Sequence, residues 1–136
     1  MVCFLGKGTM QTATAAAVKP AADGAVVTKA VLRAAARLAI SNRVLARVLG
    51  VSEATVSRMG SGAYVLGPRD KPFELAVMFI RLFRSLDAIV GGDDQAARGW
   101  LTSENTALGG VPADLVQTLP GLVNVVAYLD ARRALV

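Results

Sequence analysis

The chain has 136 residues, enough for one modest domain or for a small domain with an appended module. Aromatic residues make up only 5% and hydrophobic residues 54%, so the core must consist mainly of Ala, Val and Leu, which favours helices. The longest apolar run, residues 75–80, is far shorter than the roughly 18 residues of a membrane-spanning helix, and residues 2–5 are too few for a signal peptide. The single Cys3 has no partner for an internal disulfide, and we expect a cytoplasmic protein without a membrane segment.

The net charge of +5 is unevenly distributed along the chain. Residues 28–71 carry eight Lys or Arg against two acidic residues, whereas residues 72–136 carry five basic against seven acidic residues. A basic front half suits a polyanionic partner, and a mildly acidic, apolar rear half suits a protein partner.

The first part of the chain has no periodic apolar face. Residues 1–27 hold glycines, a Thr/Ala tract and Pro20, and we expect a flexible N-terminal arm. Thr28 has the character of an N-cap, so a first helix is predicted to begin there. Its apolar side would be formed by Val31, Leu32, Ala35, Leu38 and Ala39.

Two short helices are predicted next. Ser41 or Asn42 caps a helix that runs through Leu49. Ser52 caps another that runs through Met59, where a Gly-Ser-Gly stretch stops it.

The stretch RVLARVLGVSEATVSRM, residues 43–59, fits a DNA-reading helix-turn-helix. Gly50 supplies the positive φ that the turn needs, and the small Ala46 allows a close crossing of the two helices. A plain helical hairpin has the same needs, but the local charge and the short polar outer helix favour DNA. Direct base readout should be modest, with much of the affinity coming from backbone contacts of the arginines. The residues expected to contact DNA are Arg43, Arg47, Ser52, Glu53, Ala54, Thr55, Ser57 and Arg58.

The rear half is also predicted to be helical, and no stretch alternates as a strand would. Pro72 fits the first turn of a long helix over 72–90. This helix is apolar on nearly all sides between Leu75 and Ile80, which indicates self-association as a homodimer. Three more helices are expected: from Asp93 or Asp94 to Leu101, from Pro112 to about Leu119, and, after Pro120-Gly121, over 122–133. The fold class is therefore all-α.

Residues 43–59 resemble Xre-type helix-turn-helix regulators. The stretch WLTSENTALGGVPADLVQTLPGLVNVVAYL, residues 100–129, resembles the C-terminal toxin-binding domain of the Xre/MbcA/ParS antitoxins. That domain pairs a Trp-Leu and an Asn with a Leu-Gly-Gly, a Pro-initiated helix and a Gly before the final helix. The resemblance implies an Xre-like helix-turn-helix followed by a small helical toxin-binding domain.

The function implied by this resemblance is that of a type II antitoxin. Its partner would be a RES-domain toxin, an NAD-consuming enzyme that the antitoxin blocks by covering the active site. Such antitoxins also repress their own operon by binding operator DNA as homodimers. The chain would then divide into a flexible N-terminal arm (1–27), a helix-turn-helix DNA-binding domain (28–71) and a helical dimerisation and toxin-binding domain (72–136).

The toxin contacts are expected near the end of the chain. Arg132 and Arg133 either stabilise the C-terminus of the last helix or enter a pocket built for an anionic dinucleotide. The apolar stripe that precedes them, from Leu122 to Leu129, is interpreted as core. The candidate toxin-binding residues are Trp100, Asn105, Tyr128, Arg132, Arg133, Leu135 and Val136.

Enzymatic chemistry has no visible basis in the sequence. The chain has no His, its lone thiol lies in the expected arm, and Asp93-Asp94 is explained as a helix cap. We therefore expect no enzyme activity, no catalytic residue, no cofactor and no metal. The alternative is a plain helix-turn-helix transcriptional regulator whose rear domain senses a small ligand or only dimerises.

Overall fold

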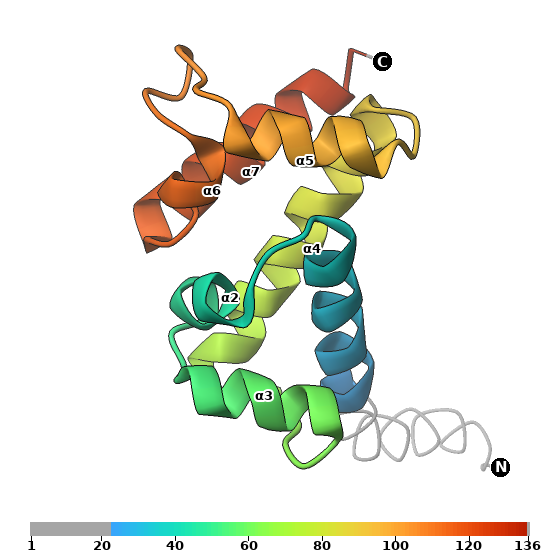
Figure 1. Ribbon diagram of the computed structural model, residues 1–136, viewed down its shortest axis with the longest axis vertical. Helices are drawn as coiled ribbons and strands as arrows, with labels where there is room; N and C mark the ends of the chain where they lie inside the picture. Colours follow the sequence, from blue (N-terminus) through green and yellow to red (C-terminus); the bar gives the residue numbers. More distant parts are fainter. Residues whose placement is uncertain (1–22, 136) are drawn as a thin grey trace, which may run out of the picture.

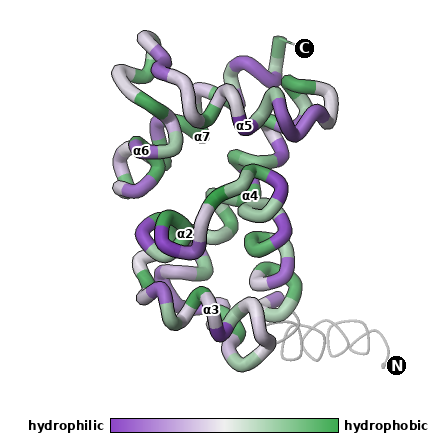
Figure 2. Tube along the Cα trace, in the orientation of Figure 1, coloured by the Kyte–Doolittle hydropathy of each residue, from purple (hydrophilic) through white to green (hydrophobic). Residues whose placement is uncertain are grey.

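In the computed structural model, which describes residues 23–135, one long helix joins two groups of shorter helices. This helix, α4 (Lys71–Ile89), has the N-terminal helix, α2 and α3 around one end and α5, α6 and α7 around the other (Figure 1). Hydrophobic and hydrophilic residues alternate along the labelled helices (Figure 2), as expected for helices that each bury one side. The predicted all-α class is confirmed: the described residues hold no strand and one isolated β-bridge, Asn105 with Gly110.

The N-terminal helix differs from the sequence prediction. It covers residues 23–37 of the described chain, so residues 23–27 are helical and do not belong to a flexible arm. The rest of the expected arm lies outside the described residues. Thr28 is not an N-cap but a buried residue inside the helix, where its hydroxyl donates to the carbonyl of Gly24 at 2.7 Å. The same hydroxyl accepts from the backbone N–H of Leu66 at 3.0 Å, which the sequence pattern did not show.

The helix-turn-helix prediction is confirmed in its elements. Helix α2 (Asn42–Leu49) has Ser41 as its N-cap, and α3 (Glu53–Ser61) has Ser52. Gly50 has a φ of 72°, the left-handed conformation that the tight turn requires. Helix α3 ends two residues later than predicted, because the second glycine of the Gly-Ser-Gly stretch is the one that adopts the left-handed conformation.

Asp93, rather than Asp94, is the N-cap of helix α5. Its carboxylate accepts hydrogen bonds from the backbone N–H groups of Gln95 and Ala96, at 3.0 and 3.2 Å. Helix α5 spans Asp94–Thr102 and is reached from α4 through two glycines with positive φ. Because Asp93 caps the helix, the carboxylate of Asp94 is available for another contact.

The end of the chain corrects another prediction. Helix α6 (Pro112–Leu115) is one turn long, and α7 (Leu119–Arg133) contains Pro120 and Gly121 in its first turn instead of following them. Proline fits this turn because the first helical N–H groups have no intrahelical partner. Gly121 is needed for packing, since a Cβ there would overlap the carbonyl of Leu115.

Most of the apolar surface of α4 is covered by the chain itself. Phe79, Leu82 and Leu86 are fully buried. The predicted core stripe of α7, which contains Leu122, Val125, Val126 and Leu129, is buried as well. The prediction of self-association therefore depends on the part of α4 around Val77, whose side chain is 43% exposed. Among the described helices none, α4 included, is long and apolar enough to cross a membrane.

Candidate functional site

The outer face of α3 is an exposed surface on which the polar side chains are joined by local hydrogen bonds. The Oγ of Ser52 accepts a hydrogen bond from the backbone N–H of Thr55 at 3.1 Å, and the two hydroxyls lie 2.9 Å apart. The hydroxyl oxygen of Thr55 also accepts from Nη2 of Arg58 at 3.1 Å, which holds the guanidinium along the helix. Val56 and Met59 are buried on the other side of α3. The exposed α3 residues assigned to DNA are Glu53, Ala54, Ser57 and Arg58.

The two arginines of α2 that were assigned to DNA are both exposed. Nη1 of Arg47 donates to Oε1 of Gln117 at 3.3 Å and so links α2 to the turn after α6. A phosphate contact by Arg47 must use its remaining N–H groups or break this bond. Arg43 lies one turn earlier on the same helix.

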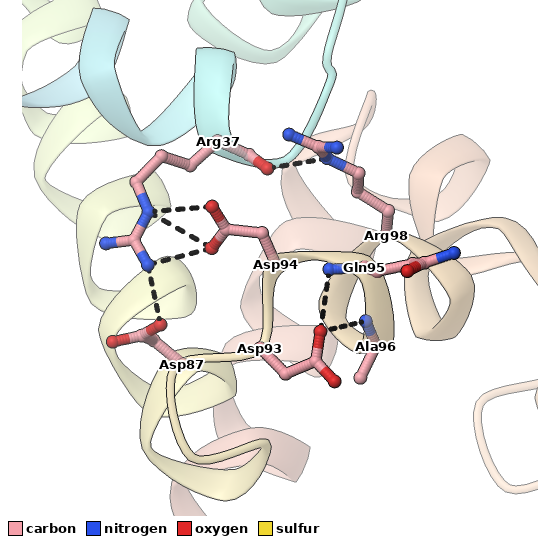
Figure 3. Close-up of polar contacts among 7 residues, drawn as sticks. All are labelled: Arg37, Asp87, Asp93, Asp94, Gln95, Ala96 and Arg98. Carbon is pink, nitrogen blue, oxygen red and sulfur yellow. Dashed lines mark hydrogen bonds and ion pairs between the residues drawn. The ribbon is translucent and has the colours of Figure 1, made fainter.

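An ion-pair cluster joins the N-terminal helix to the rear of the molecule (Figure 3). The guanidinium of Arg37 contacts the carboxylate of Asp94 at 2.8 Å and that of Asp87 at 3.2 Å. Nε of Arg98 donates to the backbone carbonyl of Arg37 at 2.8 Å, and the Arg37 guanidinium lies 4.8 Å from the ring centroid of Phe83. We call Arg37, Asp87, Asp94 and Arg98 the Arg37 cluster.

Each partner of the main ion pair changes the titration of the other. The hydrogen bonds from Arg37 hold the pKa of Asp94 below its ordinary value, and those with Asp94 raise the pKa of Arg37. The sequence counted Arg37 only as part of the positive charge, because residues so far apart in the chain leave no local pattern.

Three of the proposed toxin-binding residues lie together. The rings of Trp100 in α5 and Tyr128 in α7 stack with their centroids 6.2 Å apart and their planes at 20°. The guanidinium carbon of Arg132 lies 5.8 Å from the Tyr128 centroid, close enough for a cation–π attraction. We call Trp100, Tyr128 and Arg132 the aromatic patch. It combines apolar area with a cation at the surface.

The other proposed toxin-binding residues have different surroundings. Asn105 lies in the loop between α5 and α6, where its Oδ1 accepts from the backbone N–H of Leu108 at 3.1 Å. Its side chain therefore shapes this loop. Arg133 is exposed in the last turn of α7, and Leu135 is 85% exposed just beyond it. Val136 lies outside the described residues.

Sequence reasoning overlooked two exposed apolar residues of α7. Leu119 is 55% exposed and Val123 is 44% exposed. They are four residues apart, so they share one side of the helix, and Ala127 continues it. The sequence prediction missed this pair because it ended the preceding helix at about Leu119 and began the last helix at residue 122. We call Leu119, Val123 and Ala127 the α7 stripe.

Comparison with protein families assigns both parts of this structure. Residues 17–81 match the antitoxin Xre-like helix-turn-helix domain. Residues 85–134 match the antitoxin Xre/MbcA/ParS C-terminal toxin-binding domain. The chain belongs to the Xre/MbcA/ParS antitoxins.

This assignment confirms the resemblance noted in the sequence and places each surface within one of the two matched segments. The α3 face belongs to the helix-turn-helix part of the antitoxin, and the aromatic patch and α7 stripe belong to its toxin-binding part. The two matched segments adjoin inside α4, the helix that both parts share. Comparison with curated proteins gave no match.

Proposed function

We propose that this antitoxin acts in a type II toxin-antitoxin module, where it neutralises a RES-domain, NAD-consuming toxin by covering the active site. It also represses its own operon in the cytoplasm, as a homodimer on operator DNA. In this role it is a binding protein and not an enzyme, and it needs no cofactor. The observation that carries the proposal is the succession of a helix-turn-helix match and a toxin-binding match on one chain. A division into a DNA-binding domain, which includes the N-terminal helix and ends at residue 71, and a dimerisation and toxin-binding domain (72–136) is part of the same proposal.

The toxin surface in this proposal combines the α7 stripe with the aromatic patch. Exposed Leu119 and Val123 provide apolar area of the kind that marks protein interfaces. Arg and aromatic side chains are enriched among the residues that dominate binding energy, which favours Trp100, Tyr128 and Arg132 as anchors. Because Asn105 shapes its loop, it contributes to the surface mainly by holding that loop in place.

The C-terminal arginines are proposed to enter the toxin's anion-binding cleft. Arg132 and Arg133 are exposed in the last turn of α7, after the core residue Leu129. A guanidinium donates two parallel hydrogen bonds to a phosphate or carboxylate, which suits a site built for a dinucleotide. Leu135, which is 85% exposed, follows these arginines and is proposed to pack against the rim of that cleft.

The α3 face is proposed to read the operator in the major groove. Ser52, Glu53, Ala54, Thr55, Ser57 and Arg58 are the residues nearest the bases in this arrangement. Arg43 is proposed to contact the DNA backbone. Arg47 contacts the DNA backbone as well, either after its hydrogen bond to Gln117 breaks or through its other N–H groups. A dimer would place its two reading helices roughly 34 Å apart, one turn of DNA, or a multiple of that distance.

The deciding experiment co-expresses the chain with its neighbouring reading frame, which we expect to encode a RES-domain toxin. The wild-type chain should restore growth and copurify with the toxin. The double variant Arg132→Ala, Arg133→Ala should release toxicity while keeping the thermal unfolding curve and operator gel shift of the wild type, because neither side chain is buried. A wild-type chain that fails to restore growth refutes the proposed neutralisation. Full rescue by the double variant at matched expression shows instead that the tail is only a solvated helix end.

A ligand-sensing regulator is the second candidate, and one observation favours it. An open cleft of about 440 Å³ lies between the connection before α2 and helices α5 and α6. Its volume is within the range of small-molecule sites, roughly 300–1,000 Å³. Ile40, Leu101 and Ala113 contribute apolar walls, and Arg98 and Gln117 contribute polar groups. An isolated gene, and operator affinity that changes with a metabolite extract, would support this reading over the antitoxin.

A further inference from the structure

One carboxylate joins the last turn of α7 to α4. Oδ1 of Asp130 accepts a hydrogen bond from the hydroxyl of Ser85 at 2.8 Å, and Oδ2 contacts Nη2 of Arg81 at 2.6 Å. Arg81 and Ser85 are four residues apart in α4, so they lie on the same side of that helix. Each carboxylate oxygen has its own partner, which fixes the orientation of the group. We call Arg81, Ser85 and Asp130 the Asp130 clamp.

The clamp lies at the point where α7 leaves the core. Leu129 is 1% exposed, whereas every described residue after Asp130 is exposed. The N–H of Ala134 donates to the carbonyl of Asp130 at 3.2 Å and so closes the last turn. Helix ends open easily where few buried contacts hold them. Loss of the clamp should therefore loosen the turn that carries Arg132 and Arg133.

The position of Asp130 is unfavourable by local criteria. A carboxylate in the last turn of a helix opposes the helix dipole, which favours cations there. Asp130 also precedes Arg133 by three residues, a spacing at which acidic and basic side chains pair along a helix. Among the described residues Arg133 makes no ion pair, and the carboxylate contacts α4 instead. The clamp thus occupies a carboxylate that would otherwise compete for Arg133.

We propose that the Asp130 clamp positions the toxin-binding end of α7: it holds the last turn in place and leaves Arg132 and Arg133 free for the toxin. This inference rests on the proposed neutralisation and adds two residues of α4 to it. Arg81 and Ser85 are positioning residues, because they act through Asp130. The last turn of α7 and helix α3 lie at opposite ends of the molecule (Figure 1), so operator binding should not depend on the clamp.

The first test measures amide hydrogen exchange in the full chain without toxin. Arg81→Ala should speed the exchange of the Ala134 N–H about threefold or more, because the last turn opens more often. Arg84→Ala is the matched control: Arg84 is also exposed in α4 and makes no ion pair among the described residues. Its exchange should equal that of the wild type.

The second test titrates each variant with the purified toxin from the co-expression experiment. Arg81→Ala should raise the dissociation constant about tenfold, because binding must then order the last turn and free Arg133. Arg81→Lys keeps the charge and should stay within about threefold of the wild type, since the ion pair can still form. Arg84→Ala should bind like the wild type, and operator gel shifts should not change in any of these variants.

Two further variants separate positioning from direct contact, since Arg81 itself is 66% exposed. Ser85 is fully buried and cannot reach the toxin. Ser85→Ala should nevertheless weaken toxin binding about threefold, because it removes one partner of Asp130. In an Asp130→Ala chain, Arg81→Ala should cause no further loss, because the group through which it acts is already absent.

Three outcomes would overturn the clamp proposal. The first is an Arg81→Ala variant with the amide exchange and toxin affinity of the wild type. The others are a Ser85→Ala variant without effect on binding, or an equal loss from Arg81→Ala with and without Asp130; both would make Arg81 a direct toxin contact. Circular dichroism on each variant separates weaker binding from a lost fold. A wild-type chain that binds no toxin refutes the proposed function instead, and amide exchange still decides whether the clamp holds the last turn.

Discussion

Replacing Thr28 with Val tests how the N-terminal helix holds the segment between α3 and α4. Thr28 is 4% exposed, and its hydroxyl accepts the N–H of Leu66 at 3.0 Å while donating to the carbonyl of Gly24 at 2.7 Å. Valine keeps the shape of the side chain but has no acceptor. The variant therefore leaves the buried N–H of Leu66 without a partner.

The expected loss of stability follows from that orphaned donor. A buried backbone N–H without a partner costs about 1–3 kcal/mol. The other lost bond costs less, because the carbonyl of Gly24 keeps its ordinary helical partner. We therefore expect Thr28→Val to lower the free energy of unfolding by about 1–3 kcal/mol. Thr28→Ser is the control: it keeps the hydroxyl, loses one methyl group and should cost about 1 kcal/mol.

Urea unfolding followed by circular dichroism measures both variants. The slope of the free energy against urea should not change, because the fold and the exposed surface stay the same. A Thr28→Val variant as stable as the wild type would refute the reasoning. So would a Thr28→Ser variant less stable than Thr28→Val, since packing of the methyl group would then outweigh the hydrogen bond to Leu66.

Three further predictions concern DNA binding, backbone strain and pH. Arg58→Ala should weaken specific operator binding by about 1–3 kcal/mol in gel shifts at fixed salt and leave toxin neutralisation intact; unchanged affinity would count against α3 as the reading helix. Ala39→Gly should raise the free energy of unfolding by about 0.5–1 kcal/mol, because Ala39, in the turn after the N-terminal helix and at φ 58°, is the one described non-glycine residue with a positive φ; Ala36→Gly, inside that helix, should lower it by about 1 kcal/mol. Arg37 lowers the pKa of Asp94 in the folded chain, so their pairing stabilises the fold at any pH above the ordinary aspartate pKa. This stabilisation is lost as the pH falls through the pKa that Asp94 has in the folded state. Asp94→Asn should therefore lower the melting temperature at neutral pH, and a difference that persists in strong acid would contradict this.

The sequence alone determined the features of this antitoxin that depend on neighbours in the chain. Ser52 was predicted as a cap, and the other cap was narrowed to Ser41 or Asn42, because a cap bonds to N–H groups two or three residues away; the structure selects Ser41. Gly50 was predicted in the turn because a left-handed backbone is a local requirement. The helix-turn-helix followed from these short-range rules, and the toxin-binding domain from the order of its motifs along the chain.

Tertiary structure alone decided the features that need a partner distant in the chain. Thr28 has the character of a cap, but Leu66 and the buried interior make it a bridge inside a longer helix. Gly121 has the character of a helix breaker, but the carbonyl of Leu115 makes it a packing residue inside α7. Arg37 is one of many basic residues until folding brings Asp87 and Asp94 to it. In each case the local preference is worth about 1 kcal/mol or less, and burial or pairing with a distant group outweighs it.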